Sequence, residues 1–226
     1  DVLHLMGSRP EHLQVLRAAR QAGVPVVVST IAWFDVLNTF REPGGWHRKL
    51  ARLGRFTLRT IFPETPSWRR SLYREADLLL PNSVAESRQL TRYFHVPEEH
   101  IHVVPNGTDL PNRYDSDTTE RNAEPFRRRF GRDPFVLCSG RIEPRKGQLE
   151  LIRAMRGLDV PLVLLGETVP GHECYATRCR REAADNIHFL GRLDHNDPLL
   201  TSAYAACGCL VLCGWFETPG LAALEA

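Results

Sequence analysis

Short runs of Val, Leu and Ile alternate along the chain with segments in which apolar residues recur every three to four positions. Continuous apolar runs are typical of strands that are buried on both faces of a parallel sheet. The periodic segments each have one apolar face, as expected for helices that cover such a sheet. The pattern therefore predicts an α/β protein built from βαβ units.

In the first half of the chain, every predicted strand except the last is followed by a predicted helix. Gly23 closes the first helix, and Ser83 is the expected start of another. The predicted elements, in chain order, are a strand at 1–6, a helix at 11–23, a strand at 24–30, a basic helix at 46–61, a strand at 76–83 running into a helix that starts at Ser83, and a strand at 101–109.

Residues 110–134 are polar and mark the best domain boundary, with a short helix expected at their end. We therefore predict two Rossmann-like parallel-sheet domains, residues 1–111 and 112–226, with the binding crevice at the carboxyl ends of the strands. After the boundary, the predicted elements are strands at 135–140, 160–166, 186–191 and 208–214 and helices at 147–158, 173–184, 197–207 and 219–226.

The composition is that of an ordinary globular protein. The 226 residues are 42% apolar and 25% charged, and no apolar run approaches the roughly 20 residues that a membrane span needs. The six cysteines form no CxxC pair, and we interpret them as reduced thiols of a cytoplasmic protein. Both ends of the sequence fall inside predicted elements, so we expect a fragment whose two domains are both incomplete.

Positive charge is concentrated between Arg41 and Arg74. This segment contains nine Arg or Lys residues and only two acidic residues, Glu42 and Glu64. Within this segment, one face of the helix predicted at 46–61 carries four arginines: Arg48, Arg52, Arg55 and Arg59. Two interpretations remain open. The helix packs on its own domain with solvated arginines, or it binds an anionic lipid surface or a phosphate-bearing acceptor at the inner face of a membrane. Nucleic acid is disfavoured because no aromatic platform accompanies the charge.

The first candidate binding motif is SGRIEPRKG, residues 139–147, which follows a buried strand. Gly140 permits a sharp turn, and Arg141 and Lys146 offer two cations just before a helix. Arginine binds phosphate oxygens in a bidentate manner, and lysine acts as a compact point charge. The motif predicts a phosphate-binding loop, with a solvated basic loop as the alternative.

The second motif is WFETPGLAALEA, residues 215–226. Thr218 is a plausible N-cap with Pro219 at the first helical position, which predicts a helix end able to bind an anion. Glu217 and Glu225 would repel that anion, so the motif leaves open which ligand suits both an anion-binding helix end and acidic neighbours. The alternative is a capped helix with a solvated Glu225.

These two motifs, with NIHFLGRL and VVPNGTD, resemble the family 4 glycosyltransferases of the GT-B fold. The resemblance covers nearly the whole chain. It implies an acceptor-side domain followed by a domain that binds a nucleotide sugar, and a retaining, hexosyltransferase-type enzyme of polysaccharide or glycolipid biosynthesis. In that family, a sugar moves from a nucleoside diphosphate to an acceptor hydroxyl.

The resemblance also implies roles for individual residues. Arg141 and Lys146 hold the donor diphosphate, Glu217 binds sugar hydroxyls, and Glu225 binds the ribose hydroxyls. Of these, Arg141, Lys146 and Glu217 are the candidate catalytic residues, with Glu217 orienting the sugar. Further donor-binding candidates are Gly140, Gly191, Thr218, Gly220 and Leu221. No cofactor or metal is needed if the two cations stabilise the leaving diphosphate.

The sequence departs from the family pattern at two points. Thr218 and Pro219 stand where a glycine usually follows the first glutamate, and Pro219 removes an amide donor. The stretch around Trp33 lacks the histidine that many members carry near the sugar. Two alternatives therefore stay open: a GT-B-fold sugar-nucleotide epimerase, or a non-catalytic nucleotide-sugar-binding paralogue. A nicotinamide dehydrogenase is disfavoured because no GxGxxG motif is present.

Overall fold

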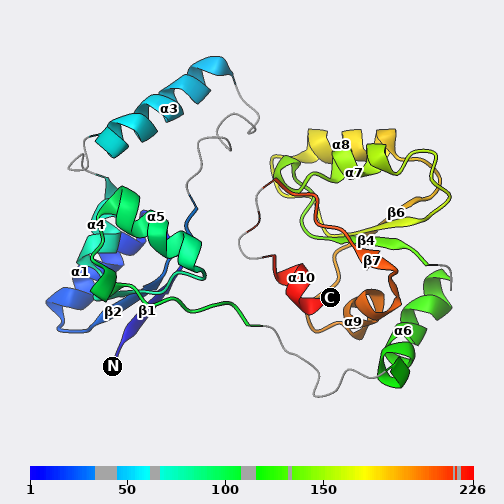
Figure 1. Cartoon of the computed structure of the whole chain (residues 1–226), viewed down its shortest axis with the longest axis horizontal. Helices are drawn as coiled ribbons and strands as arrows, with labels where there is room; N and C mark the ends of the chain where they lie inside the picture. Colours follow the sequence, from blue (N-terminus) through cyan, green and yellow to red (C-terminus); the bar gives the residue numbers. More distant parts are fainter. Residues whose placement is uncertain (34–44, 62–66, 108–115, 132–133, 216, 218–219) are drawn as a thin grey trace. The chain divides into compact units, whose positions relative to one another are not determined.

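The computed structural model describes residues 1–33, 45–61, 67–107, 116–131, 134–215, 217 and 220–226. It divides the chain into two compact units, Asp1–Asn106 and Gly107–Ala226, each with its own parallel sheet (Figure 1). These sheets confirm the predicted α/β class with two Rossmann-like parts. The boundary expected between residues 111 and 112 lies outside the described residues.

In the described part of unit 1, the parallel strands lie in the order β1-β2-β3. Leu5, Val26, Val28 and Leu79 from these strands form a core with Leu16, Leu72 and Leu90 from the helices. The elements are β1 (Leu3–Met6), α1 (His12–Gln21), β2 (Val26–Ser29), α3 (Trp46–Ile61), α4 (Trp68–Glu75), β3 (Leu78–Leu79), α5 (Val84–Phe94) and a 3₁₀ helix (Glu98–His100).

Two features of unit 1 differ from the sequence-based prediction. Of the strand expected at 101–109, residues 101–107 are described, and they form an isolated bridge, Leu79 with Ile101, and no strand. The N–H groups of His102 and Val104 donate to the carbonyls of Leu79 and Pro81, but Pro81 has no N–H to donate in return. Helix α4 was not predicted. Its start is marked by Ser67, whose side chain accepts a hydrogen bond from the backbone N–H of Arg70, a normal N-cap.

In the described part of unit 2, the parallel strands lie in the order β6-β5-β4-β7. Strand β7 is shorter than expected from 208–214, and helix α6 is longer than the short helix expected before residue 134. The elements are α6 (Ser116–Phe130), β4 (Val136–Ser139), a 3₁₀ helix (Pro144–Lys146), α7 (Gln148–Ala154), β5 (Leu162–Leu165), α8 (Glu173–Glu182), β6 (Ile187–Gly191), α9 (Pro198–Ala206), β7 (Cys209–Leu210) and α10 (Leu221–Glu225).

Strand β5 is buried on both faces of the unit 2 sheet. Leu162 and Leu164 pack into one apolar cluster with residues of α7 and α8, while Val163 and Leu165 pack into another with residues of α6 and α9. The alternation follows from the period of two along a strand. Helices therefore cover the sheet on both sides, α7 and α8 on one and α6 and α9 on the other (Figure 1).

Helix α6 contains Pro125, which cannot donate a backbone hydrogen bond and obstructs the preceding turn. The next N–H, that of Phe126, donates instead to the side-chain oxygen of Ser202 on α9, at 2.9 Å. Phe126 and Ala203 are fully buried beside this bond. The proline is thus accommodated by a contact that attaches α6 to α9.

A buried carboxylate organises the carboxyl end of β2 in unit 1. Glu86 is 1% exposed, and its Oε1 accepts hydrogen bonds from the Thr30 hydroxyl and the Ala32 N–H, while Oε2 accepts from the Asn82 N–H. Between Thr30 and Ala32 lies Ile31, a β-branched residue with φ of +43°. Such a backbone conformation is strained and persists only where its surroundings enforce it.

Replacing Glu86 with alanine is expected to destabilise unit 1 by about 3 kcal/mol, because two buried donors and one partly buried donor lose their acceptor and Ile31 loses its restraint. Urea unfolding measures the change. Glu98→Ala, which removes an exposed carboxylate from the same unit, is the control and should change stability by less than about 0.5 kcal/mol. Equal stability of the two variants would contradict the assigned role of Glu86.

Candidate active site

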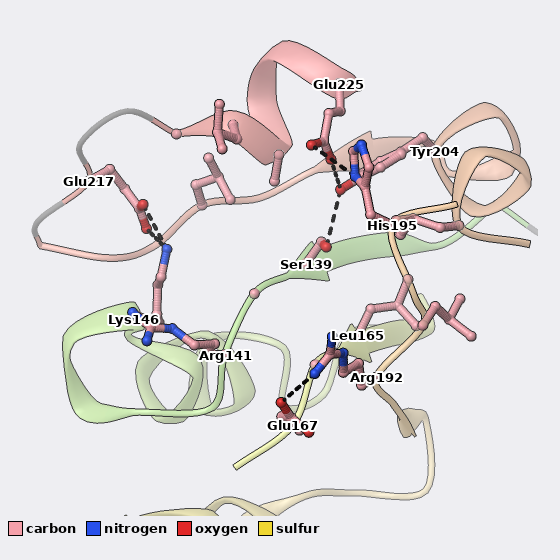
Figure 2. Close-up of a pocket in the computed structure, with 18 of the residues that line it drawn as sticks. Ser139, Arg141, Lys146, Leu165, Glu167, Arg192, His195, Tyr204, Glu217 and Glu225 are labelled. Atoms are coloured by element: carbon pink, nitrogen blue, oxygen red, sulfur yellow. Dashed lines mark hydrogen bonds and ion pairs between the residues drawn. The ribbon is translucent and has the colours of Figure 1, made fainter. Parts of the chain in front are cut away.

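A cavity of about 530 Å³ lies at the carboxyl edge of the unit 2 sheet (Figure 2). Its volume is typical of small-molecule pockets. The strand order reverses at β4, and such a switch point is where parallel α/β sheets bind ligands. The predicted site residues that line the cavity are Gly140, Arg141, Lys146, Glu217, Gly220, Leu221 and Glu225.

Two predicted donor-binding residues stand apart from this set. Gly191 ends β6 and does not line the cavity, although Arg192 and Leu193 beside it do. The carbonyl of Gly191 accepts a hydrogen bond from the Gly166 N–H at 2.7 Å, which gives it a backbone role in joining β5 and β6. Thr218 lies outside the described residues.

The helix predicted to start after Thr218 begins later. Helix α10 runs from Leu221 to Glu225 with Gly220 as its N-cap residue, and no side chain caps it. Five residues make little more than one turn, so its dipole is short. The cations of the preceding loops therefore dominate the positive charge of the cavity.

The loop that follows β4 is held in shape by a buried side chain and a shared carboxylate. Gln148 is 1% exposed, and its Nε2 donates to the carbonyl oxygen of Arg141 at 2.8 Å. Glu143 accepts from Arg145 at 2.9 Å and lies 3.3 Å from Arg141. The guanidinium of Arg141 is 60% exposed, so it can turn toward a ligand at little cost.

Lys146 forms the central ion pair of the cavity. Its Nζ lies 2.8 Å and 2.7 Å from the two carboxylate oxygens of Glu217, and the two side chains are only 18% and 22% exposed (Figure 2). Gly214 leaves room for this carboxylate, since a Cβ there would lie 2.8 Å from Glu217 Oε1. The fold thus brings together a cation and a carboxylate, which neutralise each other when no ligand is bound.

Gly147 lets the loop approach the segment after β7. Its φ is +70°, and a Cβ at this position would lie 2.4 Å from the carbonyl oxygen of Cys213. The Cys213 thiol donates to the carbonyls of Lys146 and Gly147 at 3.3 Å and 3.1 Å. Only glycine permits this close contact between residue 147 and the backbone of Cys213.

The thiols of Cys138 and Cys213 also interact. A hydrogen bond to Cys213, together with burial, raises the pKa of the Cys138 thiol, and the same bond lowers the pKa of the Cys213 thiol.

A second polar group surrounds Glu225. The hydroxyl of Tyr204 lies 3.0 Å from Glu225 Oε2 and 3.2 Å from the hydroxyl of Ser139, and His195 Nδ1 lies 3.9 Å from Glu225 Oε1 (Figure 2). Burial raises the pKa of Tyr204 to about 12. The phenol is therefore protonated at neutral pH and remains a hydrogen-bond donor.

Several residues that line the cavity were not predicted from the sequence: Ser139, Tyr204, Glu167, Arg192 and His195. Arg192 lies 3.2 Å from Glu167, and both side chains are well exposed, so this ion pair contributes little to stability. Ser139 and Arg192 belong to the two motifs SGRIEPRKG and NIHFLGRL, which is the signal that could have identified them. Tyr204 had no such signal because it lies in an ordinary helical pattern.

The predicted basic surface lies in unit 1, on α3. Trp46 and Leu50 are 71% and 60% exposed there, and Arg48 is exposed beside them. The side chains of Arg52, Arg55 and Arg59 lie outside what the structure describes. In the part of the chain that is described, no helix has the length and apolar character needed to cross a membrane. Those same residues also contain no cluster of three His, Cys, Asp or Glu side chains that could hold a metal ion.

Two family models match the sequence. Glycosyltransferase Family 4 matches residues 1–111, and Glycosyl transferases group 1 matches residues 120–226. Together they account for the chain apart from residues 112–119.

Curated relatives are glycosyltransferases. A GDP-mannose-dependent monoacylated alpha-(1-6)-phosphatidylinositol monomannoside mannosyltransferase of Corynebacterium glutamicum is 27% identical over 197 residues, 83% of this chain and 44% of that protein. An N-acetylgalactosamine-N,N'-diacetylbacillosaminyl-diphospho-undecaprenol 4-alpha-N-acetylgalactosaminyltransferase of Campylobacter jejuni is 32% identical over 55% of this chain and 32% of that protein. A D-inositol 3-phosphate glycosyltransferase of Segniliparus rotundus is 30% identical over 69% of this chain and 36% of that protein. The chain thus spans less than half the length of these relatives.

Solved structures show the fold. HepE of Anabaena in complex with UDP-glucose superposes with a TM-score of 0.58 at 18% identity, over 93% of this chain and 53% of that one. UDP-N-acetylglucosamine 2-epimerase from Rickettsia bellii superposes with a TM-score of 0.52 at 13% identity, over 93% of this chain and 50% of that one. Since a structure that holds UDP-glucose and an epimerase structure both match, the fold alone does not choose the reaction.

The sequence comparisons favour a glycosyltransferase over an epimerase. Both family models describe glycosyltransferases, and so do the names of the three curated proteins given above. Parallel sheets in both units and the structural neighbours fit the same assignment. The chain belongs to the family 4 glycosyltransferases of the GT-B fold.

Proposed function

We propose that the protein is a retaining glycosyltransferase that moves a sugar from a nucleoside diphosphate to an acceptor hydroxyl. The observation that carries the proposal is the meeting of Arg141, Lys146, Glu217 and Glu225 around one cavity of unit 2. Two cations at one side of the cavity suit a diphosphate. Carboxylates suit the hydroxyl-rich sugar and ribose on either side of it.

The chemical demand on the site is charge that develops on the leaving diphosphate as the bond to the sugar breaks. Lys146 and Arg141 supply fixed positive charge at that point, and such preorganised groups lower the barrier because they need no reorganisation. Glu217 orients the sugar through hydrogen bonds from its hydroxyls. The proposed reaction therefore uses side chains for the charge and is metal-independent.

The ion pair of Lys146 and Glu217 gives donor binding a defined sequence of contacts. A phosphate oxygen that approaches Lys146 competes with the Glu217 carboxylate, now 2.7 Å from the ammonium. Once Lys146 turns to the phosphate, Glu217 is left to accept hydrogen bonds from the sugar. One event thus prepares both groups, and neither charge is left unpaired in a partly buried position.

The acceptor is proposed to be lipid-linked. The Corynebacterium and Campylobacter relatives are named for acceptors with a phosphatidylinositol or an undecaprenol part. The exposed Trp46, Leu50 and Arg48 of α3 would suit the interface of an anionic membrane, where aromatic, apolar and basic side chains combine.

Thermal stabilisation by nucleotide sugars tests the donor. We expect at least one common nucleoside diphosphate sugar to raise the melting temperature, since a ligand that binds only the folded state stabilises it. Lys146→Ala should lose this stabilisation. It should also raise the activation barrier by about 2–4 kcal/mol, which is measured as slower release of nucleoside diphosphate. Arg181→Ala, which removes an exposed cation of α8, is the control. Unchanged turnover of Lys146→Ala would remove this loop from the mechanism.

Glu217→Gln separates the two roles of the ion pair. Without the competing carboxylate, Lys146 is available to phosphate, so a nucleoside diphosphate without sugar should bind several-fold more tightly. Turnover with the sugar donor should fall on the order of tenfold or more, because the sugar loses a charge-assisted acceptor. Asp159→Asn, which neutralises an exposed carboxylate of the same unit away from the cavity, is the control. If the nucleoside diphosphate binds Glu217→Gln more weakly than it binds the wild-type protein, Glu217 and phosphate do not compete for Lys146.

The membrane proposal is tested by charge reversal. Replacing Arg48, Arg52, Arg55 and Arg59 with glutamate should reduce sedimentation with anionic vesicles by roughly tenfold or more, since each cation near such a surface contributes about 1 kcal/mol. Replacing the same four residues with lysine keeps the charge and should leave binding nearly unchanged. If the wild type, the glutamate variant and the lysine variant bind vesicles equally, the arginines of α3 are solvated and do not bind a membrane.

A further inference from the structure

Glu225 lies on an element that cannot fix its position alone. Helix α10 has five residues, none of them buried. Isolated helices of this length are unstable because nucleation costs more than a single turn returns. The carboxylate therefore depends on contacts from outside its own helix.

Tyr204 supplies such a contact from a rigid element. Helix α9 is capped at its start by the Asp197 side chain, and Ala203 and Ala206 are buried against the unit 2 core. The Tyr204 ring packs against the same cluster, and its hydroxyl lies 3.0 Å from Glu225 Oε2. A well-packed ring thus holds one oxygen of a carboxylate on a short helix.

The protons in this group can be ordered from the donor and acceptor chemistry. A carboxylate only accepts, so the single phenol proton of Tyr204 points to Glu225. The Ser139 hydroxyl, 3.2 Å away at the end of β4, can then donate to the Tyr204 oxygen. The chain Ser139–Tyr204–Glu225 joins the end of a central strand to the carboxylate (Figure 2). Glu225 Oε1 lies 3.9 Å from His195 Nδ1, too far for a hydrogen bond, and so keeps its lone pairs for a ligand.

We infer that Tyr204 is a positioning residue for donor binding, which holds Glu225 in the orientation that accepts the ribose hydroxyls. The inference rests on the proposed function, because it takes Glu225 to contact the ribose. Since the effect passes through Glu225, Tyr204 should influence the nucleoside end of the donor and not the diphosphate.

Isothermal titration of the 226-residue chain tests this with UDP and GDP, the 2′,3′-dideoxy form of whichever binds, and inorganic pyrophosphate. The wild-type chain should bind the ribonucleotide on the order of tenfold more tightly than the dideoxy form, through its charge-assisted hydrogen bonds. Tyr204→Phe should reduce this ratio to within about threefold of unity and leave pyrophosphate binding unchanged. In a Glu225→Ala background, Tyr204→Phe should have no further effect.

Tyr175→Phe is the matched control, because it removes a phenol hydroxyl that accepts from the Leu149 N–H in the same unit. The ribose ratio should not change in this variant. If Tyr204→Phe does not fold, Ser139→Ala should lower the ratio in the same direction by a smaller factor.

The outcomes are distinguishable. An unchanged ratio in Tyr204→Phe overturns the positioning role while leaving the proposed function intact. A wild-type chain that binds no nucleoside diphosphate, or that binds both forms equally, overturns the proposed role of Glu225 and the inference with it.

Discussion

Burial of β5 on both faces is the constraint on which the rest of unit 2 depends. Leu162 to Leu165 alternate between two apolar clusters, so helices must cover both sides of the sheet. Polar side chains are then excluded from the faces and can gather only at the edges. Because parallel strands end together, the loops after β4, β6 and β7 meet at one edge, and this is where the cavity lies.

At that edge, charge is arranged in pairs. Lys146 is matched by Glu217, Arg141 and Arg145 by Glu143, and Arg192 by Glu167. Paired charges keep the ligand-free cavity close to neutral and avoid unpaired ions in partly buried positions. An anionic ligand must then compete for the cations, which favours ligands that also offer hydroxyl groups to the released carboxylates.

Sequence patterns predicted the elements with a clear apolar pattern well and the shortest elements poorly. Helix α1 follows from its apolar period and strand β5 from its continuous apolar run, whereas β7 has two residues and α10 starts at Leu221, beyond the predicted cap. Short elements carry too few positions to show a period, and tertiary contacts set their limits. Two motifs were enough to identify residues that line the cavity. The side-chain contacts within the cavity were not predictable from the sequence. Lys146 and Glu217 are 71 positions apart, and Tyr204 and Ser139 are 65 positions apart.

The contact of Gly147 with Cys213 has a consequence for the proposed reaction. Two stretches of main chain touch there with no room for a Cβ, so their separation is set by van der Waals radii and not by the ammonium and carboxylate nearby. In the proposed reaction a phosphate displaces Glu217 from Lys146, and the backbone contact gives the two segments no reason to drift apart when it does. The side chains can then exchange partners while the main-chain spacing of the segments that carry them stays as it was.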